Sequence, residues 1–220
     1  MSDAYSAKPL GVVSRPPIVS IGRVALPIHL ILASASPRRT QLLAAAGVPH
    51  SVVTAAVTEH EDPSTDPAVM VLHNARLKAA AVSALHPEAL VLGADTTVAL
   101  GDRALNKPAD LAESAAMLRS LSGREHTVHT GVCLLCPSLG VDEAHDVTAW
   151  VRFRTLSDAD IARYQSLVNT LDKAGAYGIQ EGREIIIASH QEPVSTIMGL
   201  PVEFLVARLK ELGLLERLRA

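Results

Sequence analysis

The segment Ala33-Ser-Ala-Ser-Pro-Arg-Arg39 brings hydroxyl and guanidinium groups together in a short stretch. It follows the apolar run 29–33, and Ser36 and Pro37 are suited to be the N-cap and first residue of a helix. A helix that begins after a strand directs backbone N–H groups and the positive end of its dipole toward a bound anion. Arginine and serine donors at that position would suit a polyphosphate. On the motif alone, a phosphate site and an ordinary helix cap with two solvated arginines are equally consistent.

A single acid provides the second candidate for chemistry. Asp95 follows the apolar run 89–94 within Leu92-Gly-Ala-Asp-Thr-Thr97. If the strand ends with that run, Asp95 lies at the carboxyl end of a buried strand, where α/β sheets bind ligands. A carboxylate there can hold Mg²⁺ or orient a water for attack on phosphorus. The alternative is a loop aspartate in an Asx-turn.

Other polar residues could complete such a site. Glu59 could share a metal ion with Asp95, while Lys78 and Lys107 would neutralise phosphate charge. Gln180 could hydrogen-bond the edge of a base. Taken one at a time, each of these residues is better explained as a solvated surface group.

Cysteine and histidine spacing argues against redox or zinc chemistry. Cys133 and Cys136 are three residues apart on an expected strand, so their side chains face opposite sides of the sheet. His126 and His129 diverge for the same reason. The sequence also contains no G-x-S-x-G, Walker A or G-x-G-x-x-G motif, which excludes the hydrolase elbow, the P-loop and the dinucleotide fingerprint.

Strand-like and helix-like segments alternate along the chain, which predicts an α/β fold with a mixed central sheet flanked by helices. The expected strands are 29–33, 52–57, 89–94, 127–136, 146–153 and 184–188. The expected helices begin at Pro37, Pro67, Asp110, Ser157 and Pro201, and the second should bury Val69, Leu72, Ala75 and Ala79. Residues 1–27 are expected to form a flexible extension and 28–220 a single domain with a substrate cleft.

Composition limits the partners. The 220 residues are 48% apolar and 3% aromatic with a net charge of −3, which is no footprint of a protein that binds nucleic acid polymers. No run reaches the roughly 18 apolar residues of a membrane span. The apolar stretch 24–35 is interrupted by Pro27 and His29, so a signal peptide is not expected and the predicted location is cytoplasmic.

Several motifs, in order along the chain, resemble those of the Maf family of nucleoside triphosphate pyrophosphatases. The matching stretches are Leu32-Ala-Ser-Ala-Ser-Pro-Arg-Arg39, Gly93-Ala-Asp-Thr96, Lys107-Pro108, Ser122-Gly123 with Thr130-Gly-Val132, Phe153-Arg154, Asp172-Lys-Ala-Gly-Ala-Tyr-Gly-Ile-Gln180 and Gly199-Leu-Pro201. Together they extend from about residue 30 to residue 201, which is nearly the whole chain after the expected extension.

The resemblance implies hydrolysis of a nucleoside triphosphate to the monophosphate and pyrophosphate with a divalent cation, Mg²⁺ or Mn²⁺, and it suggests a homodimer. By position, Asp95 takes the role of the catalytic acid that accepts a proton from water, and with Glu59 it would hold the metal. The resemblance assigns base selection to Arg38, Thr96 and Gln180, and phosphate contacts to Ser34, Arg39, Lys78 and Lys107.

The base is less firmly indicated than the triphosphate. Ala94-Asp95-Thr96 with Tyr177-Gly-Ile-Gln180 resembles the branch that acts on dTTP and UTP. One alternative is the same reaction on 7-methyl-GTP or another modified nucleotide. A second alternative, from a different class, is a cell-division regulator that binds a nucleotide without hydrolysing it.

Overall fold

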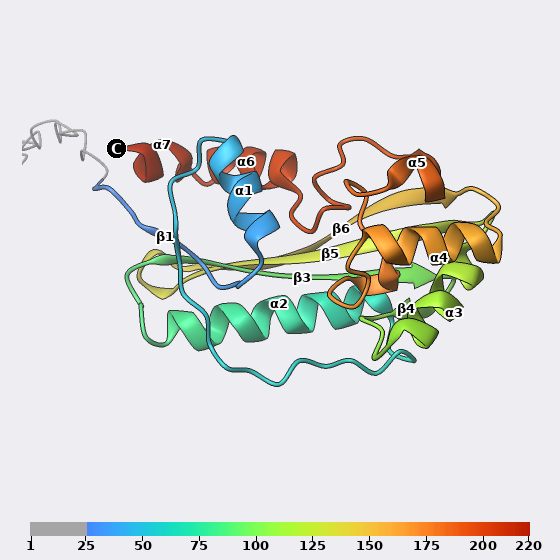
Figure 1. Ribbon diagram of the computed structural model, residues 1–220. Coiled ribbons are helices and arrows are strands. Elements are labelled where there is room, and N and C mark those ends of the chain that lie inside the picture. Colours follow the sequence, from blue (N-terminus) through green and yellow to red (C-terminus); the bar gives the residue numbers. More distant parts are fainter. Residues whose placement is uncertain (1–25) are drawn as a thin grey trace, which may run out of the picture.

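Seven strands form one mixed sheet in the computed structural model, which describes residues 26–220 (Figure 1). The sheet order is β2-β1-β3-β5-β6-β7, and β4 pairs with β3 as well. β2, β1 and β3 are parallel, and the remaining pairs are antiparallel. The strands are β1 (Leu30–Leu32), β2 (Ser51–Val52), β3 (Leu90–Leu100), β4 (Arg103–Leu105), β5 (Glu125–Cys136), β6 (Val141–Phe153) and β7 (Ile187–His190). The predicted α/β class with a mixed sheet is confirmed.

Helices cover both faces of this sheet, and the first four begin with the predicted caps or first residues. Asp110 accepts a hydrogen bond from the Glu113 backbone, and Ser157 and Asp160 form a reciprocal capping box. The α-helices are α1 (Pro37–Ala45), α2 (Pro67–Ser83), α3 (Leu111–Leu121), α4 (Asp158–Leu167), α5 (Arg183–Ile186), α6 (Val202–Glu211) and α7 (Leu215–Arg219). Short 3₁₀ turns are η1 (Pro137–Leu139) and η2 (Ala174–Ala176).

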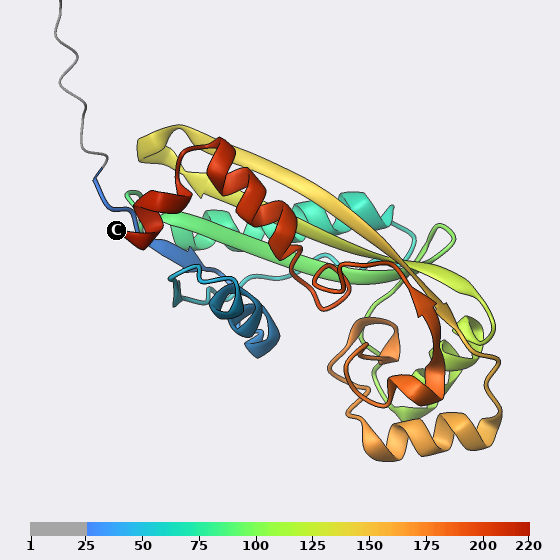
Figure 2. The same cartoon turned by 90° about the horizontal axis from the view of Figure 1, so that it is seen from above.

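The long strands β3, β5 and β6 support two hydrophobic clusters on one face of the sheet. Leu90, Leu92 and Ala94 of β3 pack into a cluster with α6 and α7, whereas Val98, further along the same strand, packs into a cluster with α3 and α4. Side chains at every second position share a face, so one strand can serve both clusters in turn. Figure 2 shows α1, α6 and α7 over one half of the sheet and α3, α4 and α5 beside the other half.

The opposite face is covered by α2, which lies very close to the strands. A Cβ atom on Gly131 would come within 2.4 Å of the Val71 carbonyl oxygen, and one on Gly93 within 2.1 Å of that of Ala75. Glycine at these positions therefore lets the helix backbone approach the sheet. The expected buried face of this helix is correct for Ala75 and Ala79, Leu72 is half-buried, and the expectation is wrong for Val69, which is 58% exposed.

The edge of β3 is paired in two separate places. β1 pairs with residues Leu90 to Leu92, and β4 pairs with Val98 to Leu100. Between these contacts no other described strand covers that edge. The strand also runs past Ala94, so the prediction that Asp95 lies at its carboxyl end was wrong: Asp95 lies in the middle of β3.

Other expectations had mixed outcomes. The segment expected as a strand at 184–188 begins as α5 and becomes β7 only from Ile187. Cys133 and Cys136 lie in different clusters, as their spacing predicted, and both are free and buried. Residues 1–25 of the expected extension lie outside the described residues. Within 26–220, no helix is long and apolar enough to cross a membrane.

Close packing of α2 predicts the effect of adding one methyl group at Gly131. Gly131→Ala should lower the free energy of unfolding by about 3 kcal/mol, because helix backbone cannot move aside as a flexible side chain can. Gly101→Ala is the control: nothing lies within 4 Å of its Cβ, and only its φ of +62° is unfavourable, at about 1 kcal/mol. Urea unfolding measures both variants. Equal losses in the two would contradict the packing argument.

Candidate active site

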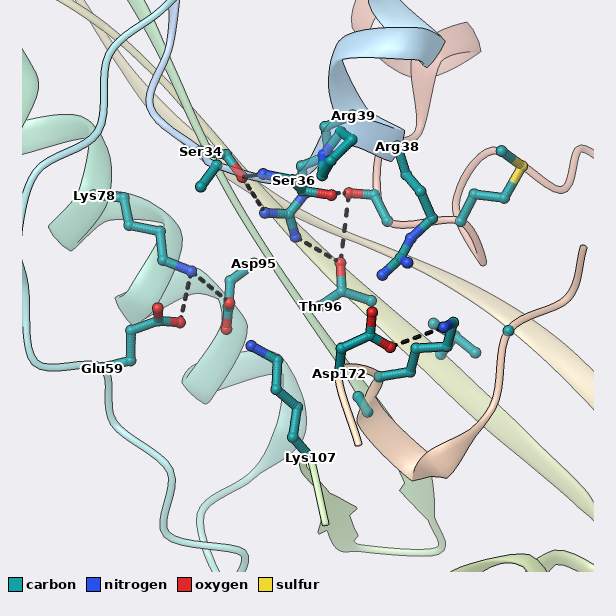
Figure 3. A pocket seen from close by; sticks show the side chains of 18 of the residues that line it. Ser34, Ser36, Arg38, Arg39, Glu59, Lys78, Asp95, Thr96, Lys107 and Asp172 are labelled. Atoms are coloured by element: carbon teal, nitrogen blue, oxygen red, sulfur yellow. Dashed lines mark hydrogen bonds and ion pairs between the residues drawn. The ribbon is translucent and has the colours of Figure 1, made fainter. Parts of the chain in front are cut away.

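A pocket of about 540 Å³ opens at the uncovered edge of β3 (Figure 3). This volume is in the range that holds small-molecule ligands. Its walls come from the loop before α1, the loop before α2, β3, the segment around η2 and the turn at 197–199. All the residues predicted for the site line it: Ser34, Arg38, Arg39, Glu59, Lys78, Asp95, Thr96, Lys107 and Gln180.

Two neighbouring residues reach this pocket from opposite faces of the sheet. Asp95 points toward α2, where it contacts Lys78, and Thr96 points toward α1, where it contacts Arg39. Successive side chains on a strand always alternate in this way. Because no strand from residues 26–220 covers the edge here, both sides of β3 open into one pocket.

Lys78 joins the two acids of the site. Its Nζ lies 2.6 Å from Glu59 Oε2 and 2.8 Å from Asp95 Oδ1. The side chains of Lys78 and Asp95 are 14% and 13% exposed, so this pair is largely shielded from water, whereas Glu59 is 37% exposed. Asn74, one turn before Lys78 on α2, donates to the second oxygen of Asp95 at 3.0 Å. Both carboxylate oxygens of Asp95 therefore have a donor on the same helix.

Arg39 is buried and holds the edge of β3 to its surroundings. Four of the five N–H groups of its guanidinium donate to protein oxygens. The acceptors are Gly199 O at 2.8 Å, Ser34 Oγ at 2.8 Å, Ala94 O at 2.9 Å and Thr96 Oγ1 at 3.1 Å. Burial lowers the pKa of Arg39, and the charges of Asp95 and Glu59 offset part of that effect. One N–H group is left for a ligand, so this arginine is first of all a clamp between elements.

The start of α1 supplies unused donors to the same pocket. Ser36 is the N-cap residue, but its hydroxyl makes no capping hydrogen bond. Arg38 is half-buried and Lys107 is exposed, and both side chains extend into the pocket in Figure 3. Neither is in an ion pair with another described residue. Two cations and the N-terminus of α1 are thus available to an anion.

The wall around η2 is fixed by buried aromatic residues. Tyr164 Oη accepts from Gly178 N at 3.1 Å and lies 3.3 Å from Gly178 O, and His126 Nε2 lies 2.8 Å from Tyr177 Oη. Burial lowers the pKa of His126 to about 4 and raises that of Tyr164 to about 12, so both are neutral near pH 7. These contacts hold the segment that ends in the exposed Gln180.

Lys173 fixes the same wall from inside. It is 6% exposed, and its Nζ donates to Asp172 Oδ1 at 2.8 Å and lies 3.4 Å from Glu181 Oε2. Its charge is thereby neutralised by protein acids. The cations that remain for a ligand are therefore Arg38 and Lys107, and not Lys173.

The acids of the site fit a metal ion that is shared with a substrate. Asp95 and Glu59 offer carboxylate oxygens, which are the ligands that Mg²⁺ and Mn²⁺ prefer. Among the described residues, no group of three or more His, Cys, Asp or Glu side chains could hold a metal on its own. Mg²⁺ is commonly bound by one or two carboxylates together with substrate phosphates, and this pair of acids matches that arrangement.

Sequence reasoning missed Asn74 and Tyr164 as parts of the site, and it included Lys173 only as a member of the motif 172–180, without a role. Asn74 lies inside an expected helix and Tyr164 inside another, so nothing in their local pattern separates them from ordinary helix residues. The one available signal was polarity: Asn74 occupies a position that is 2% exposed, where an apolar residue is usual.

The fold and the pocket define an α/β protein with acids and free cations arranged for a polyphosphate. The sequence matches the family model described as "Maf-like protein" over residues 29–212, and the chain therefore belongs to the Maf family. Among its relatives is the dTTP/UTP pyrophosphatase of Akkermansia muciniphila, 44% identical, with 84% of this chain and 96% of that protein covered. Proteins of the same name from Deinococcus radiodurans and Symbiobacterium thermophilum are 44% and 45% identical; each match covers 84% of this chain, and 93% and 94% of those proteins, respectively.

The four hydrogen bonds of the Arg39 guanidinium predict that Arg39 contributes more than Arg38 to the free energy of unfolding. Arg39→Lys should lower the free energy of unfolding by about 2 kcal/mol or more, because a lysine cannot donate to four acceptors and leaves buried carbonyls unpaired. Arg38→Lys should change it by no more than about 0.5 kcal/mol. Urea unfolding compares the two, and equal stability would contradict the clamp.

Proposed function

We propose that this chain hydrolyses nucleoside triphosphates, dTTP and UTP first of all, to the nucleoside monophosphate and pyrophosphate. The observation that carries the proposal is the group Asp95, Lys78 and Glu59, an acid pair joined by a cation and facing a pocket with further free cations. Relatives at about 44% identity bear the name of this activity. We propose residues 28–220 as the functional domain, and the homodimer and cytoplasmic location stay predictions.

The triphosphate would lie between α1 and α2. The first backbone N–H groups of α1 and the Ser34 and Ser36 hydroxyls are its contacts at one side, and Lys107, which follows β4, is a further contact. Lys78 is its contact at the other side, where phosphate oxygens compete with Glu59 for the ammonium group. Arg39 contributes its last free N–H group and keeps these elements in place.

Asp95 is the proposed proton acceptor. A water oxygen attacks the α-phosphorus, the bond from that phosphorus to the bridging oxygen breaks, and pyrophosphate leaves with that oxygen. The proton of the water passes to Asp95, since each carboxylate oxygen has a second lone pair beside the bond it already accepts. Most of the acceleration comes from positioning and charge, as is usual in phosphoryl transfer.

Asp95 and Glu59 are the residues that would hold Mg²⁺ or Mn²⁺. When bound, such an ion neutralises phosphate charge and polarises the phosphorus–oxygen bonds.

The base would lie against the wall that ends in Gln180, with Arg38 and Thr96 on the opposite side of the pocket. An amide offers a donor and an acceptor side by side, which matches the O4 and N3–H of thymine and uracil. Steady-state pyrophosphate release over a panel of triphosphates with Mg²⁺ tests this proposal. Release mainly from dTTP and UTP supports it; preference for 7-methyl-GTP favours the other branch, and binding without release favours a regulator.

Loss of the acid charge should abolish most turnover. Asp95→Asn preserves shape but removes the proton acceptor, and kcat for dTTP should fall at least about 100-fold. Asp142→Asn is the matched control, because Asp142 also pairs with a cation of α2, Arg76, but outside the pocket. Its kcat should stay within about threefold of the wild type. Pyrophosphate release at the wild-type rate from Asp95→Asn would rule out the assignment.

Replacing the amide of Gln180 should change base selection. Gln180→Glu removes the donor to O4 of thymine but keeps an acceptor for the amino group of cytosine. The ratio of kcat/KM for dTTP to that for dCTP should therefore fall about tenfold or more. Gln191→Glu is the control, since Gln191 lies outside the pocket and uses only its oxygen, which accepts from Trp150 N. An unchanged ratio in Gln180→Glu would show that Gln180 does not contact the base.

A further inference from the structure

Asn74 lies inside α2, beside Asp95, and it uses its amide completely. Its Nδ2 donates to Asp95 Oδ2 at 3.0 Å and to His60 O at 2.9 Å, and its Oδ1 accepts from His60 N at 2.8 Å. The side chain therefore joins three parts of the site: the helix, the central strand and the loop before α2. His60 directly follows Glu59, the second acid.

A polar side chain is energetically unfavourable at the buried helix position of Asn74. Asn74 is 2% exposed, and the neighbouring helix positions that face the sheet carry Met70, Val71 and Ala75. A buried polar group that lacks a partner is destabilising, and asparagine is a poor residue for a helix interior. An apolar residue of similar size would serve packing alone, so the contacts of the amide must account for its presence.

We propose that Asn74 is a positioning residue that fixes the orientation of the Asp95 carboxylate and ties it to the loop carrying Glu59. This role rests on the proposed function, because it concerns the acid that accepts the proton of water.

The two donors on Asp95 differ in how firmly they are held. Lys78 has a long side chain and also pairs with Glu59, and a triphosphate would attract its ammonium group. Asn74 has a short side chain, and hydrogen bonds to both the N–H and the carbonyl oxygen of His60 hold its amide in place. When Lys78 turns to the phosphates, Asn74 remains as the donor that keeps the carboxylate from rotating.

Because Asn74 also contacts the loop before α2, a control must separate anchoring of that loop from orientation of the Asp95 carboxylate. Asn106 makes the same kind of link: its Nδ2 donates to Glu61 O at 2.8 Å, and its Oδ1 accepts from Thr97 Oγ1 at 3.0 Å. It therefore anchors the same loop to β3 without touching Asp95. Asn106→Ala loosens the loop, whereas changes at Asn74 also release the acid.

Two variants at Asn74 separate orientation from anchoring. Asn74→Leu keeps the approximate volume and removes every hydrogen bond. Asn74→Asp keeps the volume and the acceptor for His60 N–H, but places a carboxylate oxygen against Asp95 where a donor was. If the residue only anchors the loop, Asn74→Asp should be the more active of the two. If it positions Asp95, Asn74→Asp should be the less active.

The experiment measures pyrophosphate release from dTTP with Mg²⁺ at mildly alkaline pH, together with thermal melting of each variant. Asn74→Leu should lose about 10- to 100-fold in kcat with KM within about threefold of the wild type. Asn74→Asp should lose more, and Asn106→Ala should stay within about threefold in kcat. Should Asn74→Leu fail to fold, Asn74→Ser replaces it in the comparison.

The outcomes distinguish this role from the proposed function. An active wild type with unchanged kcat in Asn74→Leu, or with Asn74→Asp faster than Asn74→Leu, overturns the positioning role alone. A rise in KM for dTTP with an unchanged kcat overturns the positioning role as well. A wild-type chain that releases no pyrophosphate from any triphosphate overturns the proposed function, and the role of Asn74 with it.

Discussion

The arrangement of the site depends on one buried guanidinium at an interrupted sheet edge. β1 and β4 both pair with β3 on the same side, and between them the edge is left to the side chain of Arg39. A charged group in such a position is stable only because its donors meet fixed oxygens from several elements. Closing the edge with a continuous strand would satisfy the backbone more simply, and it would remove the pocket.

The unpaired stretch of the β3 edge explains how neighbouring residues of one strand can contact the same ligand. On a covered strand, Asp95 and Thr96 would serve separate faces and never meet the same ligand. Here each brings its own helix to the pocket: α2 contributes the partners of the acid, and α1 contributes anion donors on the other side. The partners of Asp95 and the anion donors of α1 thus come from different layers of the fold and are joined only at the edge of β3.

The sequence allowed the sheet class, most elements and nine of the residues that line the pocket to be predicted, but not the geometry that joins them. Caps such as Asp110 and Ser157 act locally, so their patterns are sufficient. The polar run after Ala94 predicted a strand end, whereas the backbone of β3 stays paired with β5 as far as Ala99 and the side chains of Asp95 and Thr96 face the pocket. Asn74 was missed for a related reason: its partners are a distant strand and a loop, and a helical pattern contains no information about either.

The long strands also constrain how the molecule can move. β3, β5 and β6 run without interruption beneath both hydrophobic clusters, so the two walls of the pocket are joined by a hydrogen-bonded ladder and not by a linker. Enzymes that close by hinge rotation concentrate the change in a few residues between rigid bodies. In this fold such a rotation would require breaking the ladder. Substrate entry and product exit therefore depend on side chains and loops at the rim, whose rearrangements are faster than domain closure.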